Sequence, residues 1–385
     1  MNQVPTPTPT RRQPQRTQRP ATRRPVGGSR PPEPPKSNIS TALMITLTVT
    51  VILLILSIIV LCVALAVGGA DTPSMPSDDS SSGGNQQEQT QGNKPSTNAG
   101  TNTKLYPTNP SRSSYQIPNA ASYRTIDSIS SGYAVLVELD SFSAVAGLNA
   151  DAQICPASMT KIMTLLVACE NVTSLTEQIT ISTESVTYQA NHGASGLAWV
   201  GGERVSVRDL LYAIYYRSDT VACLEMSKYI AGSEAAFVDM MNAKVKSMDL
   251  SGTRFSNSTG LYFEGEAYYS TCRDMAAIMA YALENTLAKE IITSTGAYYF
   301  STSDAPVDLI KPTWATDRFG GNATLDTVTI RGAKTGWESI PGACLVSYAE
   351  GNNGKQYVQV IVGGNGLAAA KSTEDVKYIY KNYAK

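Results

Sequence analysis

The chain has 385 residues, a formal net charge of −1 and 42% hydrophobic residues, so its length allows two or three domains. Eight of its 31 lysines and arginines lie within the first 36 residues. The remainder is therefore acidic, which argues against nucleic acid as a partner. One histidine, His192, and six scattered cysteines form neither a zinc pattern nor a disulfide framework, so we expect no metal and no cofactor.

Three segments precede the globular part. Residues 1–40 are basic and rich in proline, which predicts a disordered cytoplasmic tail. Residues 41–69 carry no charge and are long enough to cross a bilayer once as a helix; a cleaved signal peptide usually has a shorter apolar core. The basic tail should stay inside, which places the protein in the cell membrane with its bulk outside. Residues 70–117, rich in Ser, Gly, Asn and Thr, predict a flexible extracytoplasmic linker.

Residues 118–385 form the predicted domain. Alternating or apolar runs predict two strands at its start, helices in its middle, and strands followed by a helix at its end. The strands are expected at 132–139, 144–149, 324–331, 344–350 and 356–362, and the helices at 156–167, 207–214, 218–231, 233–248, 273–287 and 372–383. Ser372 or Thr373 should cap the last helix. This order predicts an α+β fold in which one antiparallel sheet joins both ends of the domain and helices cover it.

Ser158 and Lys161 open the first helical run. Residues three apart share one helix face, so the amine can contact the hydroxyl. A lysine whose pKa is lowered by burial or a neighbouring cation can take the serine proton. Ser-x-x-Lys is expected about once by chance in a chain of this size, so the pair needs support from other residues.

Two further motifs supply that support. Ser218-Asp219-Thr220 lies at the start of a predicted helix, and Lys334-Thr335-Gly336 lies at the edge of a predicted strand. A second serine can relay a proton, while a second lysine attracts an anionic substrate end and keeps the first lysine neutral by repulsion. A strand glycine lets a substrate backbone approach closely. Asp219 either places a carboxylate near the site or faces solvent.

With these motifs the chain resembles the serine penicillin-recognising enzymes, whose signature is SxxK, SxN and KTG. It is most similar to the low-molecular-mass D-alanyl-D-alanine carboxypeptidases over roughly residues 118–370. Further matching segments lie at 202–210, 260–261, 269–276, 332–337 and 342–346. The resemblance implies the DD-peptidase fold and a peptidoglycan stem peptide as substrate.

The resemblance also implies roles for individual residues. Ser158 would attack the penultimate D-alanine carbonyl to form an acyl-enzyme, Lys161 would be its general base, and Ser218 would pass the proton to the leaving D-alanine. The same serine would be acylated by β-lactams, which makes them covalent inhibitors. The substrate-binding residues would be Thr220, Lys334, Thr335, Gly336 and Trp337. Within this set, the second lysine and its threonine hold the terminal carboxylate, and the tryptophan N–H shares the oxyanion hole with that of the nucleophile.

Thr220 departs from the family pattern, which has asparagine there. Its single hydroxyl replaces an amide with two donors and one acceptor, so turnover or substrate preference is expected to differ. This leaves open a catalytically weak penicillin or muropeptide sensor and a DD-endopeptidase. A class A-like β-lactamase would need an E-x-x-x-N pattern. The candidate acids Glu264 and Glu266 are followed four residues later by Tyr268 and Ser270.

Overall fold

The computed structural model describes residues 103–303, 308–320, 323–363 and 368–385. The predictions for the tail at 1–40, the membrane helix at 41–69 and the linker up to residue 102 lie outside these residues. Within the described ranges, no helix has the length and apolar character needed to cross a membrane.

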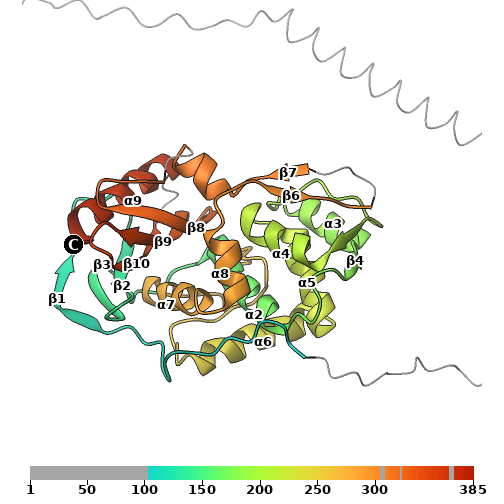
Figure 1. Ribbon diagram of the computed structural model, residues 1–385, viewed down its shortest axis with the longest axis horizontal. Helices are drawn as coiled ribbons and strands as arrows, with labels where there is room; N and C mark the ends of the chain where they lie inside the picture. Colours follow the sequence, from blue (N-terminus) through green and yellow to red (C-terminus); the bar gives the residue numbers. More distant parts are fainter. Residues whose placement is uncertain (1–102, 304–307, 321–322, 364–367) are drawn as a thin grey trace, which may run out of the picture. The chain divides into compact units, whose positions relative to one another are not determined.

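A six-stranded sheet organises the fold, in the order β1-β3-β2-β10-β9-β8 (Figure 1). Antiparallel pairing of β2 with β10 joins the start of the domain to its end. The predicted α+β fold, with one sheet joining both ends, is therefore confirmed. The strands are β1 (Asn119–Thr125), β2 (Tyr133–Glu138), β3 (Ser143–Leu148), β8 (Val328–Glu338), β9 (Gly342–Gly351) and β10 (Gln356–Val362).

The sheet differs from the prediction at both of its edges. Strand β1 was not predicted, because its mostly exposed residues show no apolar alternation, and it pairs in parallel with β3. The sheet is thus not wholly antiparallel. Strand β8 begins and ends later than the predicted 324–331, so Lys334–Gly336 lies inside the strand. Its two glycines weaken the strand pattern in the sequence, whereas pairing with β9 supplies it in the fold.

Helices cover both faces of the sheet. Helix α7 (Cys272–Ala282) packs on β2 and β10, and α9 (Ala369–Tyr383) lies on the opposite side of the strands (Figure 1). The run 342–349 in β9 is accordingly buried without alternation. The last helix starts three residues before the predicted Ser372. Ser372 and Thr373 do not cap it: their hydroxyls donate to the Ala369 carbonyl within the helix.

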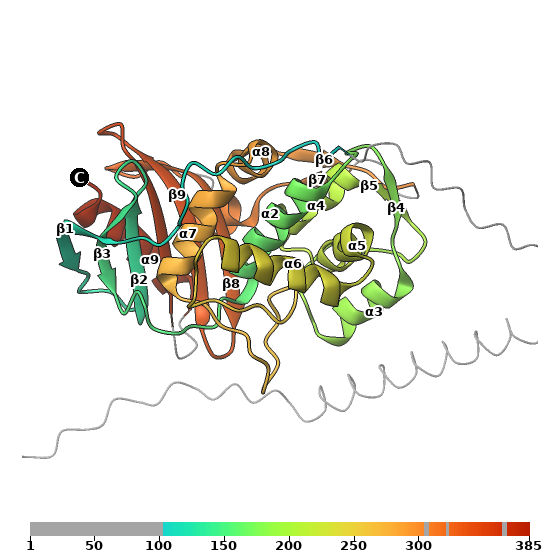
Figure 2. The same cartoon turned by 90° about the horizontal axis from the view of Figure 1, so that it is seen from below.

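The remaining helices gather beside the sheet (Figure 2). Helix α2 is buried from Lys161 to Glu170 because four helices and α7 surround it. The predicted helix 273–287 is broken: α7 ends early, and Asn285 caps a separate helix by accepting from the Ala288 N–H. The set comprises α2 (Lys161–Asn171), α3 (Thr183–Asn191), α4 (Val207–Tyr216), α5 (Thr220–Ala231), α6 (Glu234–Ser247) and α8 (Thr286–Thr293).

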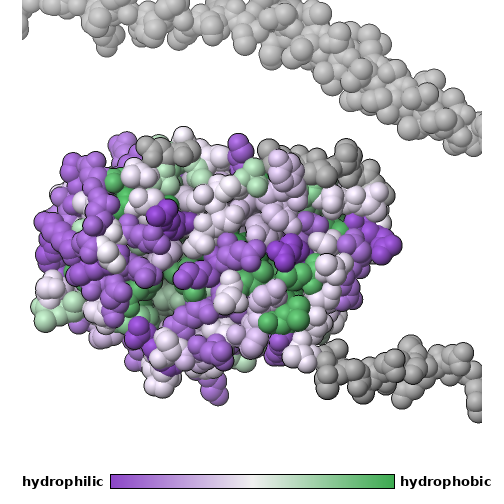
Figure 3. All heavy atoms as spheres, viewed as in Figure 1, coloured by the Kyte–Doolittle hydropathy of each residue, from purple (hydrophilic) through white to green (hydrophobic). Residues whose placement is uncertain are grey.

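Short elements complete the domain. A 3-10 turn, η1 (Ala157–Thr160), precedes α2, and a π-helical turn, η2 (Trp314–Arg318), precedes β8. There are two small two-stranded antiparallel sheets in the described residues. One pairs β4 (Gln178–Thr180) with β5 (Arg204–Ser206), and the other pairs β6 (Tyr298–Phe300) with β7 (Asp308–Ile310). On the face seen in Figure 3, hydrophilic residues predominate and hydrophobic residues form only small groups.

The described end of the predicted linker packs against the domain. Tyr115 is 1% exposed, and its N–H donates to the Met248 carbonyl. The Leu105 N–H donates to the Val172 carbonyl. Residues 103–117 therefore belong to the folded unit. Its five cysteines are all free, and four of them are buried: Cys155, Cys169, Cys223, Cys272 and Cys344.

Candidate active site

The 3-10 turn η1 brings the first motif together. Residues i and i+3 eclipse one another in a 3-10 helix, and the Lys161 Nζ lies 3.2 Å from the Ser158 Oγ. Ala157, just before the nucleophile, has a φ of +48°, a left-handed conformation that is unfavourable for a residue with a Cβ. A Cβ on Gly260 would lie 2.3 Å from the Ala157 carbonyl oxygen, so this close approach to the turn requires glycine.

Lys161 is 1% exposed, and its ammonium also donates to the Thr259 carbonyl. Burial lowers the pKa of Lys161, and the opposing influence of Cys223, Asp219 and Glu338 is smaller. The lysine is thus shifted toward the neutral form that can accept a proton.

The second and third motifs also meet. The Lys334 Nζ donates to the Ser218 Oγ at 2.9 Å and to the Thr335 carbonyl at 2.8 Å. Burial lowers the pKa of Lys334 well below the ordinary lysine value, and the charge of Lys161 lowers it further. Ser218 lies just outside α5 with a φ of +55°, a strained backbone of the kind that clusters at functional sites.

Asp219 does not face solvent. It is fully buried as the N-cap of α5, where its carboxylate accepts from the Ala222 N–H at 2.8 Å. It also accepts from the Leu197 N–H at 2.6 Å and from the Trp199 indole N–H at 2.9 Å. The residue therefore fixes the loop that follows α3 to the start of α5.

Thr220 is 1% exposed and lines the site. Its N–H donates to the Ser195 carbonyl, but its hydroxyl has no hydrogen-bond partner in the described part of the chain. A buried hydroxyl without a partner is unfavourable and is available to a bound molecule.

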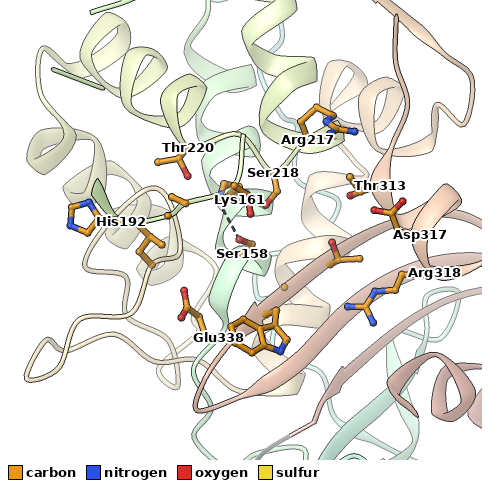
Figure 4. Close-up of a pocket in the computed structure, with 17 residues that line it drawn as sticks. Ser158, Lys161, His192, Arg217, Ser218, Thr220, Thr313, Asp317, Arg318 and Glu338 are labelled. Carbon is orange, nitrogen blue, oxygen red and sulfur yellow. Dashed lines mark hydrogen bonds between the residues drawn. The ribbon is translucent and has the colours of Figure 1, made fainter. Parts of the chain in front are cut away.

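These residues border a pocket of about 420 Å³. Ser158 and Lys161 lie near its centre; Arg217, Thr313, Asp317 and Arg318 lie on one side, and His192 and Glu338 on the other (Figure 4). The predicted residues Ser218, Thr220, Thr335, Gly336 and Trp337 also line it. Lys334 is the exception, because it lies behind the pocket surface.

Strand β8 approaches the nucleophile through a glycine. A Cβ on Gly336 would lie 3.2 Å from the backbone nitrogen of Ser158 and 3.3 Å from the Ala157 Cβ. Because β8 is the last strand of the sheet order, only one of its edges pairs with another strand of that sheet. On its other edge, residues 323–325 hydrogen-bond to Val328 and Ile330. The part of that edge from Lys334 to Glu338, beside the nucleophile, pairs with no strand among the described residues and is available for hydrogen bonding.

Arg217, Arg318 and Glu338 are among the pocket residues that the sequence analysis missed. Arg217 directly precedes Ser218, and Glu338 follows the third motif by two residues, so adjacency was their only signal. Arg318 comes from the π-helical turn η2, which has no sequence pattern that would bring it to this site. Its guanidinium donates to the Ala369 carbonyl and the Ser372 Oγ.

The structure thus brings Ser158 to Lys161 and Ser218 to Lys334 on an α+β fold, the arrangement that the three sequence motifs predict. The family model described as D-alanyl-D-alanine carboxypeptidase matches residues 119–366, more than half of the chain. The chain therefore belongs to the D-alanyl-D-alanine carboxypeptidase family, which confirms the resemblance inferred from the three motifs.

Curated relatives carry related names. The chain is 33% identical over 236 residues to D-alanyl-D-alanine carboxypeptidase DacF of Bacillus subtilis, covering 60% of this chain and 57% of the relative. It is 25% identical over 236 residues to the D-alanyl-D-alanine endopeptidase of Escherichia coli, covering 61% and 72% of the two chains.

The fold matches the Streptomyces K15 DD-transpeptidase with a TM-score of 0.58 at 22% identity, covering 67% of this chain and 98% of that one. Penicillin-binding protein 5 of Haemophilus influenzae matches with a TM-score of 0.56 at 23% identity, covering 67% and 72%.

Proposed function

We propose that this chain is a membrane-anchored serine DD-carboxypeptidase that removes the terminal D-alanine from peptidoglycan stem peptides and is acylated by β-lactams. The observation that carries the proposal is the buried Lys161 Nζ, 3.2 Å from the Ser158 Oγ, inside an open pocket. The uncharged segment 41–69 supports a single membrane helix with the tail in the cytoplasm and the domain outside.

Acylation would use the two lysines in different charge states. Neutral Lys161 takes the Ser158 proton as the Oγ attacks the penultimate D-alanine carbonyl. The backbone N–H groups of Ser158 and Trp337 stabilise the oxyanion. The proton taken by Lys161 then returns through the Ser218 hydroxyl to the nitrogen of the leaving D-alanine. Water hydrolyses the acyl-enzyme ester, which releases the shortened peptide and regenerates Ser158.

The substrate carboxylate would help to set those charge states. The carboxylate binds at Thr335, near the buried ammonium of Lys334. This is the side of the pocket that Arg217 and Arg318 line. An adjacent anion raises the pKa of Lys334 and keeps it protonated. Repulsion from that charge then favours loss of the proton from Lys161, so substrate binding prepares the base.

The free edge of β8 would align the substrate. An extended peptide can add to such an edge through main-chain hydrogen bonds. If it runs antiparallel to β8, its carboxyl end lies near Thr335, its scissile carbonyl near Gly336 and its preceding residues toward Glu338.

The test uses the detergent-solubilised full chain with a D-alanyl-D-alanine peptide and a fluorescent penicillin. Release of D-alanine together with covalent labelling supports the carboxypeptidase. Labelling without release favours a sensor, for which the unpartnered Thr220 hydroxyl is the specific observation. Rapid destruction of the penicillin favours a β-lactamase, and the absence of labelling contradicts the whole proposal.

We expect the rate of penicillin acylation to rise with pH through a midpoint below the ordinary lysine value of 10.5. Protonated Lys161 cannot act as the base, and burial lowers its pKa, so the rate is lost only as the pH falls through that lowered value. Stopped-flow acylation rates from pH 5 to 10 measure the midpoint. A rate that does not change over this range would contradict the assignment of Lys161 as the base.

Thr220→Asn is expected to raise kcat/KM for D-alanine release by about tenfold, because an amide supplies more hydrogen bonds than the unpartnered hydroxyl. Thr220→Val, which replaces the hydroxyl with a methyl group of similar size, is the matched control and should cause little loss if the hydroxyl makes no substrate contact. Steady-state kinetics of D-alanine release give kcat/KM for both variants and for the wild type. Lower activity in Thr220→Asn would show that the site is adapted to threonine.

A further inference from the structure

One buried tyrosine contacts the turn that carries the nucleophile. The side chain of Tyr268 is 5% exposed, and its hydroxyl donates to the Ala157 carbonyl at 3.0 Å. The Thr160 hydroxyl lies 2.7 Å from the same phenolic oxygen. Because the tyrosine proton is directed to the carbonyl, the threonine hydroxyl is the donor in this second contact. One phenol thus joins the residue before Ser158 to the residue before Lys161.

The position of this tyrosine is fixed by the backbone around it. Two hydrogen bonds between the backbones of Ile154 and Ser270 place the segment of Tyr268 beside the chain that leads into the turn η1. Burial raises the pKa of Tyr268 well above the ordinary tyrosine value. The hydroxyl therefore keeps its proton, and the hydrogen bond that it donates, from acid to mildly alkaline pH.

The Ala157 carbonyl belongs to the same peptide group as the Ser158 N–H. That peptide is planar and trans, so its carbonyl and its N–H point in opposite directions. A hydrogen bond that holds the carbonyl toward Tyr268 therefore directs the N–H away from the tyrosine. The Ser158 nitrogen lies beside β8, where a Cβ on Gly336 would be 3.2 Å from it. The next residue of β8, Trp337, carries the other N–H of the proposed oxyanion hole.

The orientation of this peptide group depends on its surroundings. The positive φ of Ala157 is unfavourable for a residue with a Cβ, so contacts with other residues must maintain it. Gly260 packs closely against the Ala157 carbonyl, but it provides only room for that group. The Tyr268 hydroxyl adds a directional hydrogen bond to the carbonyl oxygen.

We propose that Tyr268 is a positioning residue that orients the Ser158 N–H toward the oxyanion, acting through the Ala157 carbonyl. Its contribution grows as negative charge develops on the substrate oxygen, because an N–H donor binds that charge more strongly than a neutral carbonyl. Thr160 supports the tyrosine by donating to its oxygen. This inference rests on the proposed acylation of Ser158.

Tyr268→Phe removes the hydroxyl and keeps the ring. In the detergent-solubilised full chain, we expect the rate constant of penicillin acylation at saturation to fall about tenfold, which is less than the loss of an oxyanion-hole donor would cause. The penicillin concentration that gives half the maximal rate should change by about twofold or less, because ground-state binding does not need the oxyanion contact. The pH midpoint of acylation should stay the same, whereas a shifted midpoint would mean that the tyrosine acts on Lys161.

A boronic acid reports on the oxyanion contact without a leaving group. The probe is the boronic acid analogue of N-acetyl-D-alanine. As the Ser158 Oγ adds to its boron, Lys161 takes the serine proton and the boron becomes a tetrahedral anion, one of whose oxygens takes the place of the oxyanion. Tyr268→Phe should weaken this inhibitor by about tenfold. Binding at wild-type strength would overturn the proposal even if acylation were slow.

Tyr380→Phe is the matched control. Tyr380 is also fully buried, and its hydroxyl is hydrogen-bonded to the Ser347 hydroxyl at 2.9 Å, between α9 and β9. This variant should lower the melting temperature about as much as Tyr268→Phe does and should leave acylation unchanged. Thr160→Val should slow acylation by about threefold in the wild type and should cause no further loss in Tyr268→Phe.

Acylation of Tyr268→Phe at the wild-type rate overturns the proposal. Equal slowing in Tyr380→Phe does so as well, because the tyrosine would then contribute stability alone. Both results leave the proposed carboxypeptidase function intact. If penicillin does not label the wild type at all, the proposed function itself fails, and the role of Tyr268 fails with it.

Discussion

Ser158→Ala is expected to abolish covalent labelling by penicillin and to lower D-alanine release by about a thousandfold or more, because no other group can form the ester. Lys161→Met keeps an unbranched side chain of nearly the same length in this buried position but removes the amine proposed as the base. It should lower the acylation rate by a factor of about 10² to 10⁴. Gel fluorescence with a fluorescent penicillin measures labelling, and D-alanine release measures turnover.

The two residues should behave as one unit. If Lys161 acts only on the serine that it contacts at 3.2 Å, as proposed, the double variant should lose no more activity than Ser158→Ala alone. Lys371→Met, on the exposed surface of α9, is the control for loss of a lysine. Losses that multiply in the double variant would mean that the two side chains act in separate steps.

Asp219→Ala is expected to lower the free energy of unfolding by about 3 kcal/mol or more. Three buried donors would lose their acceptor: the N–H groups of Leu197 and Ala222 and the indole N–H of Trp199. Asp219→Asn keeps one oxygen of similar position and should lose less than half as much. Denaturant unfolding followed by tryptophan fluorescence measures both variants.

Asp219→Ala should also lower kcat/KM for D-alanine release under conditions in which the variant is still folded. The Asp219 carboxylate ties the loop after α3, whose Ser195 lines the pocket, to the helix that begins beside Ser218. Without these hydrogen bonds, Ser218 is no longer held in contact with the Lys334 Nζ. An Asp219→Ala variant as stable as the wild type would refute the role given to this residue.

The contact between Ser158 and Lys161 was predictable because it is local: any helical turn brings residues i and i+3 together. The contact between Ser218 and Lys334 spans 116 residues and depends on β8 lying beside the start of α5. Only the resemblance to a known family indicated it. The pocket position of Arg318 could not be predicted, since it depends on where the turn η2 meets the last helix.

The remaining differences are shifted boundaries and short elements that were not predicted, namely β1, α3 and β4 to β7. Starting α5 at Ser218 placed Asp219 inside the helix, whereas the residue is a cap, a role for which aspartate is strongly preferred. Strand β1 has too few buried side chains to show a pattern, and its place at the sheet edge comes from pairing with β3. The hydrophobic run of β10 was placed at its observed bounds because burial dominates its composition. The run predicted as a helix at 156–167 begins with the turn η1, and its α-helix spans Lys161–Asn171.

The five unpaired cysteines of the described residues affect how the domain reacts with oxidants and disulfides. Burial raises the pKa of every one of their thiols, to about 11 for the partly buried Cys155. Few thiolates are therefore present at neutral pH to react with oxidants or to exchange with disulfides. No disulfide links the described cysteines, so reducing conditions would break no covalent bond between side chains of the described fold.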